Sequence, residues 1–229
     1  SIGLGMFRFR RKYFLFFIKC FTDPIHSPSF SSIRSAILTK PVIFDLVSLY
    51  LQYKDGVRTQ QLTVPIDDTS DKAKAIRHNL IQIQEKLVTR SRRVEPALQI
   101  AAIPYRNTIK DEKVLCIGCR NILEIHQATL FGFSWKNITG LDLFSVNPKI
   151  KEGAMENIPF EDESFDLVTN INTLAYSGDP LKAIDECARV LKPGGRFVLT
   201  HPFNPNDPPA TSPYSKEKLS TIACTIGIK

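Results

Sequence analysis

The chain has 229 residues, of which 43% are hydrophobic and 23% are charged, and it contains 11 glycines and 15 prolines. This composition excludes a collagen-like, low-complexity or wholly disordered chain, because such chains have an excess of glycine and proline or too few apolar residues to bury a core. The longest run without Asp, Glu, Lys or Arg covers only residues 167–178. A bilayer-spanning helix needs roughly 20 apolar residues, so none is expected.

Charge divides the chain into two unequal parts. The net charge is +7 at pH 7, but residues 1–110 hold 18 Lys and Arg against 8 Asp and Glu, which gives +10. Residues 111–229 hold 12 against 15, which gives −3. A basic segment can associate with an acidic membrane surface, with nucleic acid or with an acidic partner. A solvated basic face is the simpler alternative.

Residues 1–110 are predicted to form a basic, mainly helical N-terminal region. Near the N-terminus, four basic residues precede a short apolar run that Lys19 interrupts, and this run is too short for a secretory signal. An amphipathic anchor on an acidic membrane and a first helix packed on the main domain are the two interpretations left open. The apolar run after Pro41 predicts a buried helix. Apolar residues spaced three and four apart over residues 73–87 predict an amphipathic one.

The cysteines indicate the compartment. Their number is five, an odd number in a chain too long to need disulfide staples, which favours a reducing compartment and a cytoplasmic location. Cys116 and Cys119 form a lone CxxC pair. Because a structural zinc site needs about four ligands, no metal site is expected.

From Glu112 onward, short apolar runs rich in β-branched residues alternate with helical patterns, as in a parallel sheet flanked by helices. The expected strands cover residues 114–117, 138–143, a short stretch near 150, 165–170 and 196–200, and the expected helices run to residue 130 and over 181–191. Residues 111–229 are therefore predicted to form an α/β domain with a Rossmann-like, mostly parallel sheet.

Three segments are expected to meet at the carboxyl edge of this sheet, where open α/β sheets bind their ligands. Gly118 follows the first strand and lets the backbone approach a ligand where a side chain would clash. Asp142 ends the second strand, where its carboxylate can accept hydrogen bonds from ribose hydroxyls. The segment ENIPFEDESFDLV leads into the strand that ends at Asn170.

In this order and spacing, the segments resemble class I S-adenosylmethionine-dependent methyltransferases of the methyltransferase type 11 kind, over roughly residues 111–203. The most specific pieces are NIPFEDESFDLV and ECARVLKPGGRFVL. The resemblance implies S-adenosylmethionine as the cofactor and methyl transfer to an unidentified acceptor, for which we expect a small molecule. The implied cofactor site consists of Gly118 and Cys119 around the methionine moiety, Asp142 and Leu143 at the ribose, Ala154 and Met155 beside the adenine, and Asn170 at the methyl donor.

The chain departs from the family in its first motif. An acid followed by three glycines at alternate positions is replaced by Cys116, Gly118, Arg120 and Ile122, and Ala154 stands where an Asp commonly contacts the adenine amine. A catalytically inactive nucleotide-binding or scaffold protein is therefore the alternative. The absence of GxGxxG disfavours a nicotinamide-dependent oxidoreductase. The sequence NINT after the fourth strand, in place of (D/N)PP(Y/F), disfavours nucleic acid as the acceptor.

Catalytic residues are the least defined part of this prediction, because methyl transfer can proceed through alignment of the reactants alone. His201 follows the fifth strand and is a candidate general base, with an exposed loop histidine as the alternative. Asn172 and Tyr176 are candidates for lining the pocket. Only 29 residues follow Thr200, so we expect either a sheet shorter than that of the family or a chain truncated at its C-terminus.

Overall fold

The computed structural model describes residues 40–59, 73, 76–77, 80–81, 90–92, 94–102, 108–145 and 147–200. They contain a five-stranded parallel sheet in the order β3-β2-β1-β4-β5. The strands are β1 (Val114–Ile117), β2 (Ile138–Asp142), β3 (Ile150–Glu152), β4 (Phe165–Ile171) and β5 (Leu191–Thr200). This confirms the predicted Rossmann-like α/β fold.

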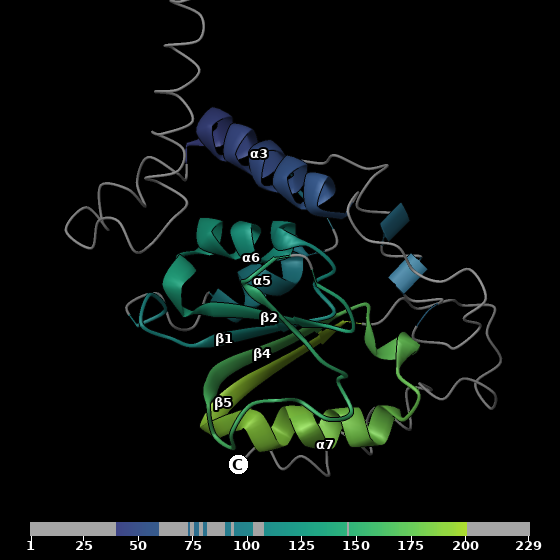
Figure 1. The fold of residues 1–229 in the computed structure, drawn as a ribbon. Coiled ribbons are helices and arrows are strands. Elements are labelled where there is room, and N and C mark those ends of the chain that lie inside the picture. The colour runs from purple at the N-terminus through teal and green to yellow at the C-terminus, as the bar shows by residue number, and fades with distance from the viewer. Residues whose placement is uncertain are drawn as a thin grey trace, which may run out of the picture.

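Helices cover both faces of the sheet (Figure 1). One side carries α5 (Glu95–Ala102) and α6 (Ile122–Ala128), with α3 (Pro41–Thr59) packed on α6 from outside, and the other side carries α7 (Pro180–Val190). Single 3₁₀ turns lie at η4 (Thr129–Phe131), η5 (Trp135–Asn137) and η6 (Leu174–Tyr176). Among the helices of the described residues, none is long and apolar enough to cross a membrane.

The central strand shows why this segment is almost wholly apolar. All four residues of β1 are buried, because successive side chains of a strand point to opposite faces and helices cover both faces here. Val114 and Cys116 join the core cluster that includes residues of α3, α5 and α6. Leu115 and Ile117 join the cluster that includes residues of α7. Residues on both sides of the expected boundary at 110 thus share one core.

The chain order places a topological switch point between β1 and β4. The chain runs from β1 through β2 to β3 on one side of the sheet and then crosses to β4 and β5 on the other. Ile117 lies level with Leu141 on one neighbour and with Asn170 on the other. The carboxyl ends of these three strands therefore meet, which is where such sheets bind ligands.

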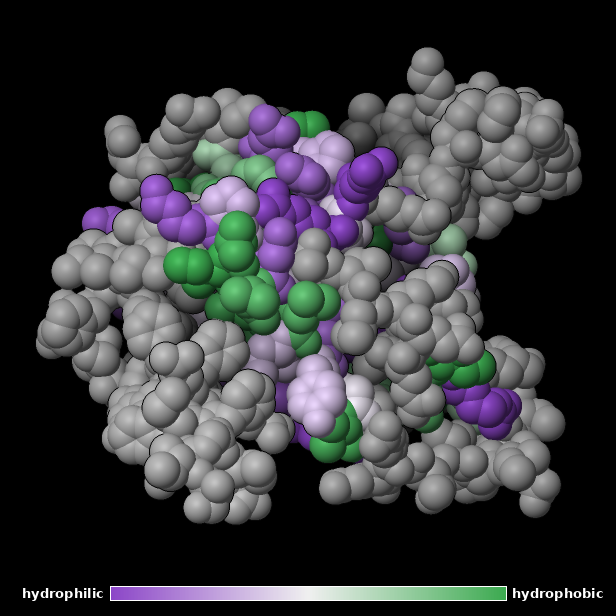
Figure 2. Space-filling view, turned by 90° about the horizontal axis from the view of Figure 1, so that it is seen from above, coloured by the Kyte–Doolittle hydropathy of each residue, from purple (hydrophilic) through white to green (hydrophobic). Residues whose placement is uncertain are grey.

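Two elements differ from the sequence prediction. The last strand begins at Leu191 and contains the predicted Pro-Gly-Gly turn as an irregularity in its pairing with β4, where Gly194 adopts a φ of +74°. The helix after Pro41 is not buried all round. The exposed large apolar residues of this helix are Val42, Leu46, Tyr53 and Val57. Figure 2 views the molecule of Figure 1 from above and shows hydrophobic residues beside hydrophilic ones on that face.

Several predictions lie partly or wholly outside the described residues. They are the N-terminal basic and aromatic run, most of the amphipathic pattern over 73–87, His201 and the C-terminal segment. Within that pattern the structure describes Ala73 as helical and buried, and Ile76 and Leu80 as helical and half-buried.

Candidate functional site

Gly118 follows β1 in a left-handed conformation, with a φ of +70°. A β-carbon at this position would lie 2.5 Å from Cβ of Thr173, so the space beside Gly118 is filled by another part of the protein. The Thr173 hydroxyl donates to the Ile117 carbonyl or the Asn170 Oδ1, at 3.2 and 2.6 Å respectively. Glycine at 118 is therefore required for contact between the ends of β1 and β4, in addition to any approach of a ligand.

The altered glycine motif has a left-handed backbone at Arg120 as well as at Gly118. Arg120 adopts a φ of +41° although it is not glycine, and its backbone N–H donates to Asp142 Oδ2 at 2.9 Å. Ile122 is the first residue of α6 and needs no positive φ. The loop therefore contains a left-handed residue at 120, an unfavourable conformation that persists because a buried carboxylate holds it.

Asp142 is buried at the end of β2, and its carboxylate accepts hydrogen bonds from backbone N–H groups nearby. Besides the Arg120 bond, its Oδ1 accepts from the Phe144 N–H at 3.4 Å. Burial raises the pKa of this carboxyl, and the N–H donors of Arg120, Phe144 and Leu143 offset part of the increase. The carboxylate thus ties the loop after β1 to the turn after β2.

The other expected cofactor residues lie at the same edge with different degrees of access. Leu143, Ala154 and Met155 are half-buried. Cys119 is buried in the core, where its Sγ would meet a β-carbon at Gly140 at 2.5 Å. Its side chain therefore faces away from solvent, and only its backbone is available to a ligand.

Asn170 lies within the end of β4 and not beyond it, and none of its surface is exposed. Its Nδ2 lies 3.8 Å from Met155 Sδ. Contact between the Asn170 side chain and a ligand therefore requires a rearrangement of the side chains packed on it.

Helix α6 contains a buried acid to which the sequence alone assigns no role. Glu124 of α6 is 7% exposed, and it accepts a hydrogen bond from Thr169 Oγ1 at 3.3 Å. Burial raises the pKa of Glu124 to about 7, with the nearby Asp142 charge adding to the increase and hydrogen bonds from Thr169 and Cys116 opposing it. The family's acid at 116 is a cysteine here, and this helix supplies a carboxyl beside it. The available sequence signal for Glu124 was its place as the single acid in the stretch ILEIHQA, all of which is buried in the structure.

A second missed acid comes from the N-terminal region. Asp55 of α3 has no exposed surface, and its Oδ1 accepts from Asn147 Nδ2 at 2.8 Å. Its Oδ2 accepts from the Ile122 N–H at 3.4 Å. The spacing of Phe44, Val47, Leu51 and Asp55 places this acid on the core-facing stripe of the helix, and that was the available signal.

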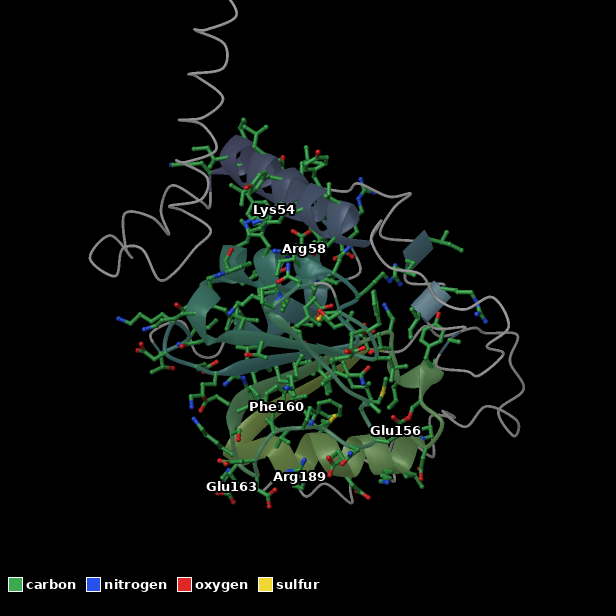
Figure 3. All side chains as sticks on the ribbon, in the orientation of Figure 1. Lys54, Arg58, Glu156, Phe160, Glu163 and Arg189 are labelled. Atoms are coloured by element: carbon green, nitrogen blue, oxygen red, sulfur yellow. The ribbon has the colours of Figure 1, made fainter. Side chains whose placement is uncertain are left out.

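The two most specific family segments contact one another through one arginine. Arg189 of α7 donates to the carbonyls of Ile158 and Phe160, both at 2.9 Å, and pairs with Asp162 at 2.6 Å (Figure 3). It also pairs with Glu186 on its own helix at 2.7 Å. The Arg of the RVLKPGG segment therefore fixes the backbone of the IPFED loop, which leads into β4.

The pocket-lining candidates also lie at the carboxyl edge. Asn172 adopts a φ of +58° and its N–H donates to the Thr200 carbonyl at 2.9 Å. Tyr176 of η6 is 73% exposed. Within the described part of the chain, no group of His, Cys, Asp and Glu is arranged to hold a metal ion.

Part of the chain is similar in sequence to known methyltransferases. Residues 115–199 match the family model described as methyltransferase domain. A protein of Bacillus subtilis (strain 168) described as the uncharacterized methyltransferase YcgJ is 42% identical over 62 residues, which are 27% of this chain and 24% of that protein. The crystal structure of YcgJ superposes with a TM-score of 0.39 and 27% identity, covering 50% of this chain and 53% of that one.

Two further relatives carry descriptions of their substrates. The sarcosine/dimethylglycine N-methyltransferase of Aphanothece halophytica is 36% identical over 61 residues, which are 27% of this chain and 22% of that protein. The tRNA U34 carboxymethyltransferase of Nautilia profundicola is 29% identical over 108 residues, which are 42% of this chain and 36% of that protein.

The fold and the order of the carboxyl-edge segments define a Rossmann-like class of α/β domain. Residues 115–199 belong within this class to the methyltransferase domains of the class I, S-adenosylmethionine-dependent family. The chain spans about a quarter of the length of the first curated relatives that it matches.

Proposed function

We propose that this protein is a methyltransferase that binds S-adenosylmethionine at the carboxyl edge of the sheet, between the ends of β1 and β4. The observation that carries this proposal is the convergence of the three family segments at the point where strand order reverses. The residues fit the cofactor, because the loop after β1 has positive φ at Gly118 and Arg120 and a buried acid ends β2. When bound, S-adenosylmethionine supplies an activated methyl group.

The side chains present suggest a distinct role for each part of the edge. Gly118 and Cys119 would contact the methionine moiety through backbone atoms. Asp142 and Leu143 would hold the ribose, with the carboxylate accepting a hydroxyl hydrogen bond besides the N–H groups it already binds. At the remaining positions, Ala154 and Met155 would pack on the adenine, and Asn170 would become accessible on rearrangement of the side chains packed on it.

We propose a small molecule as the methyl acceptor. The segment that carries the candidate site, residues 111–229, has a net charge of −3 and does not itself attract a polyanion. One relative is described as acting on sarcosine and dimethylglycine, whereas the tRNA enzyme names the competing class. Incubation with S-adenosylmethionine and either a panel of small amines or total tRNA, with release of S-adenosylhomocysteine as the readout, discriminates them. Release with tRNA alone would reject the small-molecule proposal.

The cofactor proposal is tested by calorimetric titration with S-adenosylhomocysteine. Asp142→Asn removes one acceptor oxygen, and a charge-assisted hydrogen bond contributes roughly 1.5–3 kcal/mol, so affinity should fall at least about tenfold. Asp166→Asn is the matched control, because Asp166 also accepts a backbone N–H, from Lys113 at 2.8 Å, but lies at the start of β4 on the opposite edge. Its affinity should equal that of the parent.

Two results would contradict the proposal. A folded Asp142→Asn protein with parental affinity would place the cofactor elsewhere. A parent protein that binds no S-adenosylhomocysteine at millimolar concentration would instead support the inactive scaffold, for which Arg120, Ile122 and Ala154 are the distinguishing departures.

A further inference from the structure

Asp55 contacts two loops of the methyltransferase domain although it lies 60 residues before the segment that matches the family. Its carboxylate accepts from the side chain of Asn147 and, more weakly, from the backbone N–H of Ile122. Arg58, one helical turn along α3, lies 3.4 Å from the same oxygen that binds Asn147. A fully buried carboxylate is retained in a protein only where such partners compensate its desolvation.

Each of the two partners belongs to a segment that forms the candidate site. Ile122 is the first residue of α6 and directly follows the loop of Gly118 and Arg120. Its N–H is one of the first four of a helix, which have no partner inside that helix. The N-cap residue Asn121 serves the Leu123 N–H instead, so Asp55 supplies an acceptor that α6 lacks.

Asn147 organises the other segment, the connection between β2 and β3. Its Oδ1 accepts from the Lys149 N–H at 3.0 Å, and its N–H donates to Ser145 Oγ at 3.0 Å. The 2.8 Å bond from its Nδ2 to Asp55 therefore fixes a loop that begins three residues after Asp142. The same carboxylate thus holds the segments that follow both strands of the proposed ribose and methionine site.

We propose that Asp55 is a positioning residue for the cofactor site, which it acts on through Ile122 and Asn147. Helix α3 then helps to hold the two loops of the cofactor site in position. The effect on cofactor affinity rests on the proposed function, whereas the effect on the two loops does not.

The test uses Asp55→Asn in the full chain, with hydrogen exchange as the first readout. An amide has one acceptor oxygen for the two donors that the carboxylate served, so one loop loses its partner. We expect about tenfold faster exchange in peptides covering residues 118–123 and 145–149, with unchanged exchange in β4. The matched control is Asp45→Asn, because Asp45 lies on the same helix but pairs with Arg90 at 3.2 Å. It should leave both loops unchanged.

Reciprocal exchange of the two side chains provides the rescue. In the double variant Asp55→Asn with Asn147→Asp, the amide at 55 donates to the carboxylate at 147 and its oxygen accepts from Ile122. Parental loop exchange should return. An effect that came only from loss of the buried charge at position 55 would not be repaired in this way, because position 55 remains neutral in the double variant. If Asp55→Asn fails to fold, Asn147→Ala removes the same 2.8 Å bond from the loop side.

S-adenosylhomocysteine affinity, measured on the folded proteins, is the second readout. Asp55→Asn should bind about tenfold more weakly than the parent, and the reciprocal variant should recover most of that loss. Unchanged loop exchange in Asp55→Asn, or an equal increase throughout β4, would overturn the proposal. Faster loop exchange with parental affinity would also overturn it. Absence of binding by the parent would refute the proposed function, and loop exchange would still decide whether Asp55 positions these segments.

Discussion

Gly118→Ala should destabilise the protein for two separable reasons. The new β-carbon would lie 2.5 Å from Thr173 Cβ, against the roughly 3.5–4.0 Å of a favourable carbon contact. Thr173 cannot turn away without losing the hydrogen bond that its hydroxyl donates to Ile117 or Asn170. In addition, the φ of +70° costs a residue with a β-carbon about 1 kcal/mol.

The magnitude follows by adding these two effects. Overpacking in a filled site costs typically about 1–3 kcal/mol, so the free energy of unfolding should fall by about 3 kcal/mol in total. A domain of this size loses roughly 2–4 °C of melting temperature per kcal/mol, which predicts a decrease of about 6–12 °C. Urea unfolding followed by fluorescence of the single tryptophan gives the free energy directly.

Two other glycines separate the contributions. Gly194 has a φ of +74° but nothing within 4 Å of its missing β-carbon, and Gly178 has neither a positive φ nor a neighbour within 4 Å. Gly194→Ala should therefore cost about 1 kcal/mol, and Gly178→Ala should be nearly neutral. If Gly118→Ala proves no more costly than Gly194→Ala, the close contact with Thr173 does not exist. Loss of cofactor binding in a Gly118 variant cannot by itself identify a cofactor cradle, because the glycine is needed for this packing.

Three further predictions concern stability. The parent's free energy of unfolding should fall by about 3 kcal/mol from pH 4.5 to 7, because the unfolded chain releases the Glu124 proton in this range while the folded protein retains it. Glu124→Gln should remove this pH dependence. Equal differences between parent and variant in urea unfolding at pH 5 and 8 would contradict this. Arg189→Ala removes a donor shared by two carbonyls and two carboxylates and should lower the free energy of unfolding by about 2–3 kcal/mol. Asp162→Ala, on the exposed side of the pair, should cost under about 1 kcal/mol. Gly56→Ala in α3 meets nothing within 4 Å and should raise the free energy of unfolding by about 0.5–1 kcal/mol; a loss of stability on thermal unfolding would show that the helix needs glycine there.

The strands of the α/β domain were predictable because their signal is local. Each of the runs at 114–117, 138–142 and 165–171 is a short apolar segment between turn residues, and burial on both sheet faces requires that composition. Parallel pairing then places the ends of these strands at one edge. The positions of Gly118 and Asp142 at that edge therefore followed from the sequence.

The contacts between these positions were not predictable, because they join segments far apart in the chain. Thr173 fills the space beside Gly118 from 55 residues away, and periodicity contains no information about which side chain occupies such a space. The extent of the last strand was also missed, because its Pro-Gly-Gly turn reads as a boundary while pairing with β4 continues around it.

The sequence by itself determined the α/β fold, the family of residues 115–199 and the edge at which the expected cofactor residues gather, since each of these depends on local pattern and strand direction. Only the tertiary structure decided what those residues contact. It directed the Asp142 carboxylate to the Arg120 backbone, placed Met155 against Asn170 and brought Asp55 of α3 onto the connection after β2. Such contacts depend on the rotamers and packing of segments up to 92 residues apart, which are established only when the whole core assembles.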